Sequence, residues 1–252
     1  MNMKEQLKNG ISQKKFVKVI AGIDNFDAEK VRNVVLAAEK GGANAVDVAA
    51  SEDIIKMAKE TTTLPVFVSS INAEELAMAA KLGADALEVG NFDVLYRIGM
   101  RITAKEVLEI TEKTRRLAGD DIFLSVTVPG HLEINEQVEL AQKLEKIGVD
   151  LIQTEGAATV EVQADGARGL VQKAHVSIAN TIELSRNTDI PVMTASGITS
   201  TTASMAFAAG ASAIGVGSFV NKCSSILEMT AAVMSVVSAV GDNASVTEKT
   251  FA

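Results

Sequence analysis

The chain has 252 residues, of which 47% are hydrophobic and 4% aromatic, enough for one domain with a large aliphatic core. Acidic residues outnumber basic ones by 32 to 24, and the formal charge of −8 argues against nucleic-acid binding, which depends on a basic patch. The apolar stretch 226–240 contains Glu228 and is too short to cross a bilayer, so we expect no membrane association.

The usage of cysteine and histidine argues against disulfides and metal sites. Cys223 is the only cysteine, so no intrachain disulfide can form and a reducing compartment fits. His131 and His175 lie far apart, and neither has a ligand-type partner at helical spacing. We therefore expect neither a metal nor a bound cofactor.

A recurring phrase divides the chain. The sequence Gly-Ala-Asn-Ala-Val-Asp-Val at 42–48 has counterparts at 83–89, 148–154 and 210–216. In each copy a glycine suited to the end of a helix precedes a short apolar strand, which is typical of a joint between a helix and a parallel sheet. Together with the other strand entries, these joints predict eight strands, at residues 17–22, 45–50, 65–70, 86–91, 123–129, 151–156, 191–197 and 213–218.

Helical patterns separate the predicted strands. Asp27, Ser51 and Asn72 are candidate N-caps, and Thr103 with Glu106 has the spacing of a capping box. Strict alternation of strand and helix predicts a parallel sheet with right-handed crossovers. Eight such units favour a closed barrel over an open sheet.

The alternative is a doubly wound open sheet, which would need a glycine-rich fingerprint after the first strand. Asn25-Phe26-Asp27 stands there instead. The sequence therefore predicts an α/β protein with a single closed (β/α)8 TIM barrel. We expect one domain over 1–252, with the barrel at about 16–240 and short tails at both ends.

Polar residues inside apolar strands are expected to face the barrel interior. Lys18 stands in the first strand, Asp47 in the second and Glu88 in the fourth. A buried lysine needs a paired charge or a lowered pKa. One interpretation is a buried ion network low in the barrel; the other is a catalytic lysine with Asp47 and Glu88 as acid–base groups. Asp24, at the exit of the first strand, is a candidate for substrate contact.

The most specific signal lies after the seventh and eighth strands. Ser196, Gly197 and Ile198 leave the seventh strand, and Gly217 and Ser218 leave the eighth. Glycines at such turns let backbone N–H groups approach phosphate oxygens at the C-terminal face of a barrel. These two turns predict a phosphate-binding site, with tight chain reversal alone as the alternative.

Further residues are candidates near this face. Glu155 is expected to face inward from the sixth strand, and the segment after it, 157–170, has the length of a lid. Arg168 in that segment and Lys173 just after it are candidate cations for a phosphate, with solvated surface charges as the alternative. His131, at the exit of the fifth strand, is a candidate acid–base group or an incidental loop histidine.

The motifs resemble those of known families. Thr194–Thr199 and Ala213–Lys222 are similar to the turns of phosphate-binding barrels that include tryptophan- and histidine-pathway enzymes. A narrower resemblance, over about 12–240, is to the family called hypothetical chloroplast reading frame twenty-three, a domain of unknown function of cyanobacteria and of algal and plant plastids. It rests on Val17–Ala28, Asp47-Val-Ala, Thr154-Glu-Gly and Val-Asn-Lys222. This resemblance implies the barrel fold and a location in the cyanobacterial cytoplasm or the plastid stroma.

The first strand is also similar to that of phosphoribosylanthranilate isomerase. Lys18-Val-Ile-Ala-Gly22 lacks the cysteine that serves that isomerase as general base. The chain also lacks the fuller catalytic sets of indole-glycerol-phosphate synthase and thiazole synthase. The resemblance therefore implies a fold and a phosphate site, and assigns no reaction.

Three functional hypotheses follow. The first is a lyase or isomerase of a small phosphorylated metabolite, and the second is a non-catalytic sensor or partner-binding protein that keeps the phosphate site. The third, an FMN-dependent oxidoreductase, is disfavoured because no basic residue is placed to serve the flavin ring. A small phosphorylated molecule or phosphate is the expected partner, and a homo-oligomer is compatible with the sequence.

Overall fold

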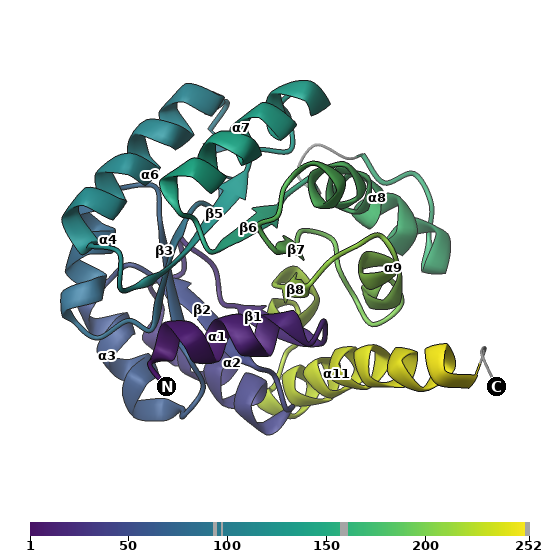
Figure 1. Cartoon of the computed structure of the whole chain (residues 1–252). Coiled ribbons are helices and arrows are strands. Elements are labelled where there is room, and N and C mark those ends of the chain that lie inside the picture. The colour runs from purple at the N-terminus through teal and green to yellow at the C-terminus, as the bar shows by residue number, and fades with distance from the viewer. Residues whose placement is uncertain (93–94, 97, 157–160, 250–252) are drawn as a thin grey trace.

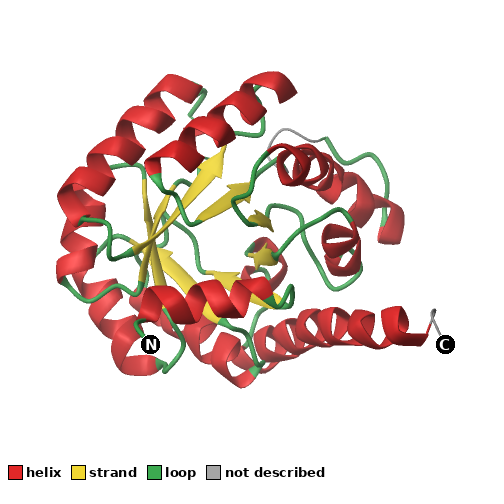
Figure 2. Ribbon diagram, viewed as in Figure 1, coloured by secondary structure: helices red, strands yellow, loops and turns green. Residues whose placement is uncertain are grey.

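The computed structural model describes residues 1–92, 95–96, 98–156 and 161–249, with side chains placed as far as residue 241. Parallel strands form a closed barrel in which each strand pairs with the next and the last pairs with the first (Figure 2). The predicted (β/α)8 barrel is therefore confirmed. Its strands are β1 Phe16–Ile20, β2 Ala45–Ala49, β3 Val66–Ser70, β4 Ala86–Val89, β5 Phe123–Val128, β6 Leu151–Thr154, β7 Val192–Thr194 and β8 Ala213–Val216.

Helices surround the barrel and cover the outer face of its strands (Figure 1). They are α1 Met3–Ser12, α2 Ala28–Lys40, α3 Glu52–Thr61, α4 Ala73–Lys81, α6 Ala104–Ala118, α7 Ile134–Ile147, α8 Gly166–Asn187, α9 Ala203–Ala208, α10 Ser218–Asn221 and α11 Ile226–Lys249. The last of them, α11, packs against α2 and α9. None of the described helices combines the length and apolar character that crossing a bilayer would require.

Local signals account for most of these elements. Gly42, Gly83, Gly148 and Gly210 have φ of 80°, 89°, 79° and 107°, so each recurring phrase is a joint at which glycine takes the left-handed turn. The side chains of Asp27, Asn72 and Thr103 cap their helices, and Glu106 completes the predicted capping box. Ser51 occupies the N-cap of α3 but makes no side-chain cap bond.

Several strands end before their predicted limits. β4 ends at Val89 rather than at residue 91, β6 at Thr154 rather than at 156, and β8 at Val216 rather than at 218. The residues that follow leave the sheet, and many of them line a pocket at this end of the barrel.

The N-terminal segment, expected as a tail, is a helix. Asn2 and Glu5 form a capping box at its start, and Leu7 and Ile11 are 1% exposed. They pack with Phe16, Phe67, Phe123 and other residues at the N-terminal end of the barrel interior. The Nζ atoms of Lys4 and Lys8 lie 3.1 and 2.8 Å from Asp150 carboxylate oxygens. This helix therefore covers the N-terminal end of the barrel, and the opposite end is the one available for a site.

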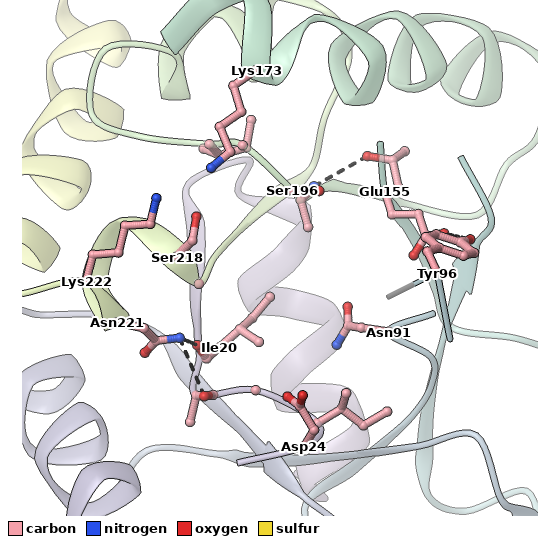
Figure 3. A pocket seen from close by; sticks show the side chains of 18 residues that line it. Ile20, Asp24, Asn91, Tyr96, Glu155, Lys173, Ser196, Ser218, Asn221 and Lys222 are labelled. Atoms are coloured by element: carbon pink, nitrogen blue, oxygen red, sulfur yellow. Dashed lines mark hydrogen bonds between the residues drawn. The ribbon is translucent and has the colours of Figure 1, made fainter. Parts of the chain in front are cut away.

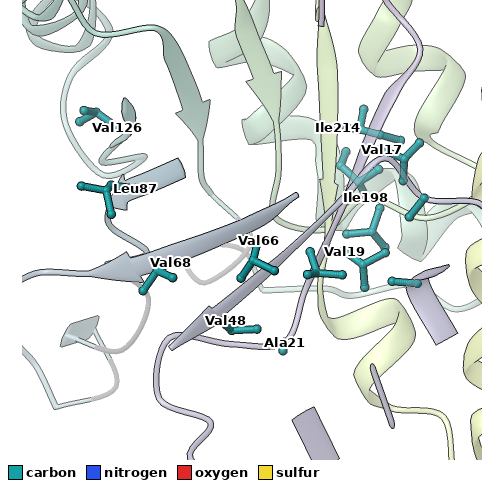
Figure 4. Close-up of a cluster of buried hydrophobic side chains, with 14 of the residues drawn as sticks. Val17, Val19, Ala21, Val48, Val66, Val68, Leu87, Val126, Ile198 and Ile214 are labelled. Atoms are coloured by element: carbon teal, nitrogen blue, oxygen red, sulfur yellow. The ribbon is translucent and has the colours of Figure 1, made fainter. Parts of the chain in front are cut away.

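Side chains alternate along β1 as the period of a strand requires. Val17 and Val19 belong to the apolar shell between strands and helices, as do Val48 of β2 and Val66 and Val68 of β3 (Figure 4). Lys18, between the two valines, is fully buried on the other face of the strand. The interior of the barrel is thus apolar at its N-terminal end and polar above that layer.

Candidate functional site

Lys18, Asp47 and Glu88 meet inside the barrel, as predicted. The Lys18 Nζ lies 2.5 Å from Glu88 Oε2 and 3.1 Å from Asp47 Oδ2, and none of the three is more than 1% exposed. Ser69 donates to Asp47 Oδ1 at 2.5 Å, and Ser125 donates to Glu88 Oε2 at 2.9 Å. Each charge is therefore paired with an opposite charge or a hydroxyl, as a buried ion needs.

Burial alone would lower the pKa of Lys18, but the charges of Asp47 and Glu88 outweigh it and raise that pKa above its usual value. Burial raises the pKa of Asp47 to about 6 against the attraction of Lys18. Lys18 thus stays protonated at neutral pH, and a protonated amine is no nucleophile. Among the described residues that line the pocket above, none belongs to this cluster. Both findings favour the buried ion network over the catalytic lysine.

Gln153 connects the ion cluster to the end of the barrel. Its Nε2 donates to Glu88 Oε1 and to Asn91 Oδ1, both at 2.7 Å. Gln153 is fully buried on β6, whereas Asn91 follows β4 and lines the pocket. The cluster therefore supports the floor of the pocket from below.

The pocket lies at the C-terminal end of the strands and has a volume of about 570 Å³ (Figure 3). That is within the range of about 300–1,000 Å³ typical of sites for small molecules. Segments that follow β1, β4, β6, β7 and β8 contribute to its wall. Its lining is Ile20–Asp24, Asn91, Tyr96, Thr154, Glu155, Lys173, Ala195–Ile198, Gly217, Ser218, Asn221 and Lys222.

All five residues of the two glycine turns, 196–198 and 217–218, line this pocket. Ser196 and Gly197 have φ of 72° and 83°, so two successive residues adopt left-handed backbone. For serine this conformation costs about 1–2 kcal/mol. Gly217 is the N-cap of α10, and Asn221 in α10 donates to the carbonyl of Ile20 at 3.0 Å. The two predicted turns therefore meet on one side of the pocket, fixed to the ends of β1, β7 and β8.

Two lysines extend toward these turns. Lys173 comes from α8 and Lys222 ends α10, and Figure 3 shows both ammonium groups directed toward the side of the pocket where Ser218 lies. Lys173 was a candidate cation in the sequence, whereas Lys222 was given no role. The available signal for Lys222 was its position at the end of α10, which begins at the second glycine turn.

The wall of the pocket formed after β4 and β6 is acidic and aromatic. Glu155 accepts hydrogen bonds from the Tyr96 hydroxyl and from the backbone N–H groups of Phe92 and Gly130. His131 Nδ1 lies 2.9 Å from the Tyr96 hydroxyl. Glu155 and His131 were candidates in the sequence, but Tyr96 was missed because no periodic signal marks the segment between β4 and α6.

The remaining candidates are distributed differently. Asp24 lines the pocket, as expected for a group at the exit of β1. Arg168 is exposed near the start of α8, and it is not among the described residues that line the pocket. The predicted lid at 157–170 is shorter than expected because α8 begins at Gly166. Residues 157–160 of it lie outside the described residues.

No group of three His, Cys, Asp or Glu side chains in the described part of the chain is arranged to hold a metal.

Comparison of whole folds finds similar barrels among solved structures. One is (S)-3-O-geranylgeranylglyceryl phosphate synthase from Thermoplasma acidophilum, in complex with its substrate sn-glycerol-1-phosphate. The two structures have a TM-score of 0.65 and 16% sequence identity, over 96% of this chain and 99% of that one. At this identity the likeness shows a shared fold.

Sequence comparison finds closer relatives. The chain is 35% identical to the uncharacterized protein ycf23 of Pyropia yezoensis, over 96% of this chain and 89% of that protein. It is 40% identical to the uncharacterized protein ycf23 of Cyanophora paradoxa, over 90% and 93% of the two chains. The family model described as protein of unknown function (DUF561) matches residues 2–246. The chain belongs to this family, as the motifs of its strands and turns predicted.

Proposed function

We propose that this protein binds a small phosphorylated metabolite in the pocket and acts on it as a lyase or isomerase. The observation that carries the proposal is the convergence of Lys173 and Lys222 on the two glycine turns (Figure 3). Backbone N–H groups at glycine turns and lysine ammonium groups are both ligands that phosphate oxygens prefer. Because the net charge of the chain is −8, two lysines directed at the same turns are not explained by a generally basic surface.

The geometry of the backbone supports the same assignment. Ser196 holds a left-handed backbone that is costly for a residue with a side chain, and strained residues of this kind cluster at binding sites. The phosphate would lie against Gly197, Ile198, Gly217 and Ser218, with the lysines above it. The glycerol-phosphate complex of the similar barrel shows that this fold is compatible with such a ligand.

The rest of the ligand would extend toward Asp24, Tyr96 and Glu155, which also line the pocket. These groups accept or donate protons, which is the chemistry that isomerisation and carbon–carbon or carbon–oxygen bond cleavage need. A sensor would need only the phosphate side of the pocket, so the acidic and phenolic wall favours an enzyme. For the compartment, we propose the cyanobacterial cytoplasm or the plastid stroma, which the family resemblance implies.

Calorimetric titration with inorganic phosphate and with glycerol phosphate tests the binding site. Gly217→Asp places a carboxylate and a side chain in the second turn and should abolish binding. Lys222→Gln should weaken it about tenfold or more, because a charge-assisted hydrogen bond contributes about 1.5–3 kcal/mol. Arg168→Gln is the matched control and should bind as the wild type does. Equal affinity in all four proteins would refute the site.

A further inference from the structure

The hydroxyl of Tyr96 stands between a carboxylate and an imidazole. It donates a hydrogen bond to Glu155 Oε1, and His131 Nδ1 lies 2.9 Å from the same oxygen. The rings of Tyr96 and His131 meet edge to face, with centroids 5.1 Å apart. The guanidinium of Arg101 lies over the Tyr96 ring, 4.9 Å from its centroid. The phenol is thus held from both sides.

Glu155 itself is almost closed off. Glu155 is 3% exposed. The backbone N–H groups of Phe92 and Gly130 donate hydrogen bonds to its two carboxylate oxygens, at 3.3 Å each. Gly130 approaches so closely that a Cβ there would lie 2.2 Å from the Glu155 carbonyl oxygen. A bound molecule would therefore exchange a proton with this carboxylate most directly through the hydroxyl of Tyr96, which lines the pocket beside it.

The surroundings of His131 keep its ring neutral. Burial lowers the pKa of His131 below its usual value, and the positive charge of Arg101 lowers it further. Contact with the backbone of Ile102 and the charge of Glu136 act in the opposite direction and are weaker. A neutral imidazole has one N–H group and one free lone pair. Because the Tyr96 hydroxyl donates its one proton to Glu155, the contact with His131 is a hydrogen bond when Nδ1 carries the imidazole proton and donates it to the Tyr96 oxygen.

We propose that Glu155, Tyr96 and His131 form a proton-transfer unit on the wall of the pocket, with Tyr96 as the group that contacts the bound molecule. This proposal rests on the proposed function, since the molecule is the one whose phosphate lies in the glycine turns. Glu155 receives the proton that Tyr96 passes on, and His131 is a positioning residue for the Tyr96 hydroxyl. Tyr96 and Glu155 line the same pocket as the glycine turns, so the unit lies within reach of a small metabolite held there.

The step is a double proton transfer. A C–H or O–H bond of the bound molecule breaks, and its proton passes to the Tyr96 oxygen while its electron pair stays on the molecule. The original phenolic proton passes to Glu155, which becomes a neutral acid, and Tyr96 remains a phenol. The reverse sequence returns a proton to another atom of the molecule, so an isomerisation or cleavage can be completed without another co-reactant.

The sequence supplies a direct readout, because the chain has one tyrosine and no tryptophan. The near-ultraviolet absorbance of phenolate and the intrinsic emission of the protein therefore both report on Tyr96. In Glu155→Gln the carboxylate charge next to the phenol is gone, so the phenol should ionise at a pH lower by about one unit or more. Glu183→Gln, which removes an exposed carboxylate of α8, should titrate as the wild type does. Equal titrations of Glu155→Gln and wild type would overturn the proposal.

A second measurement does not depend on the folding of Glu155→Gln. In the wild type, protonation of His131 at weakly acidic pH should change the emission of Tyr96, since the two groups are in contact. This pH-dependent change in emission should vanish in His131→Gln and persist in His175→Gln, which removes the other histidine. Wild-type emission that does not change over weakly acidic pH would overturn the proposal. Absence of phosphate binding to the wild type would count against the proposed function alone, and the Tyr96 titrations would still decide the proton-transfer unit.

Discussion

Gly197 lies directly against the backbone of Lys173: a Cβ on Gly197 would be 2.5 Å from the Lys173 carbonyl oxygen. This contact joins the first glycine turn to α8 at the residue whose side chain extends over the pocket. Turn and lysine therefore form one rigid element. Because the contact requires a residue without a side chain, it also explains why the turn contains glycine at this position.

Gly197→Ala should destabilise the protein and weaken phosphate binding together. Gly83 is a matched control, since it has φ of 89° against 83° for Gly197, yet nothing would meet a Cβ there within 4 Å. The left-handed backbone alone should cost Gly83→Ala about 1–2 kcal/mol. Gly197→Ala should cost more in thermal or chemical unfolding, because the Lys173 carbonyl must move. If both variants lose the same stability and both keep phosphate affinity, the contact has no role.

Lys18→Met should be strongly destabilising. It leaves the buried Asp47 and Glu88 without their counter-charge, and removal of one partner of a buried ion pair costs about 3–5 kcal/mol. Lys56→Met is the control, because the Lys56–Glu52 pair is equally short at 2.5 Å but exposed to solvent. Its melting curve should match the wild type. A Lys18→Met curve that also matches would show that Lys18 is not sealed in the barrel.

The same cluster predicts a dependence of stability on pH. The folded-state pKa of Asp47 is raised from 3.8 to about 6, so the folded protein holds that proton more tightly than the unfolded chain does. The resulting stabilisation is complete below pH 3.8 and is lost as the pH rises through 6. Asp47→Asn lacks this contribution.

Urea unfolding of the wild type and of Asp47→Asn at a series of pH values measures the effect. The wild type should lose stability relative to the variant between about pH 4 and pH 6, whatever the constant difference between them. A difference that does not change with pH would mean that Asp47 is ionised throughout this range. Ser69→Ala should move the transition to higher pH, because Ser69 donates to the Asp47 carboxylate at 2.5 Å.

The fold was predictable because its signals are local. Each glycine joint, cap and apolar strand is encoded within a few residues, and the alternation of inward and outward side chains placed Lys18, Asp47 and Glu88 together. The two glycine turns were expected at the C-terminal end of the barrel because each follows a parallel strand. α1 was predicted as a tail because it precedes the first joint, although the capping residues Asn2 and Glu5 marked its start.

The acidic wall was not predictable as a unit. Glu155, Tyr96 and His131 follow β6, β4 and β5 respectively, and their contacts depend on how three irregular segments fold over the barrel end. No spacing in the sequence encodes that arrangement. Arg168 was a candidate for the site. Its place in the sequence, after β6, suggested contact with the phosphate, but it is exposed near the start of α8 and is not among the described residues that line the pocket.

A crystal structure of the wild-type protein with glycerol phosphate would locate the phosphate group directly. We expect electron density for the phosphate group between Gly197 and Ser218, within hydrogen-bond distance of their backbone N–H groups and close to the ammonium groups of Lys173 and Lys222. The carbon chain should point toward Tyr96. Phosphate density at another site, or an empty pocket at a concentration that saturates the protein in solution, would contradict the proposed binding site.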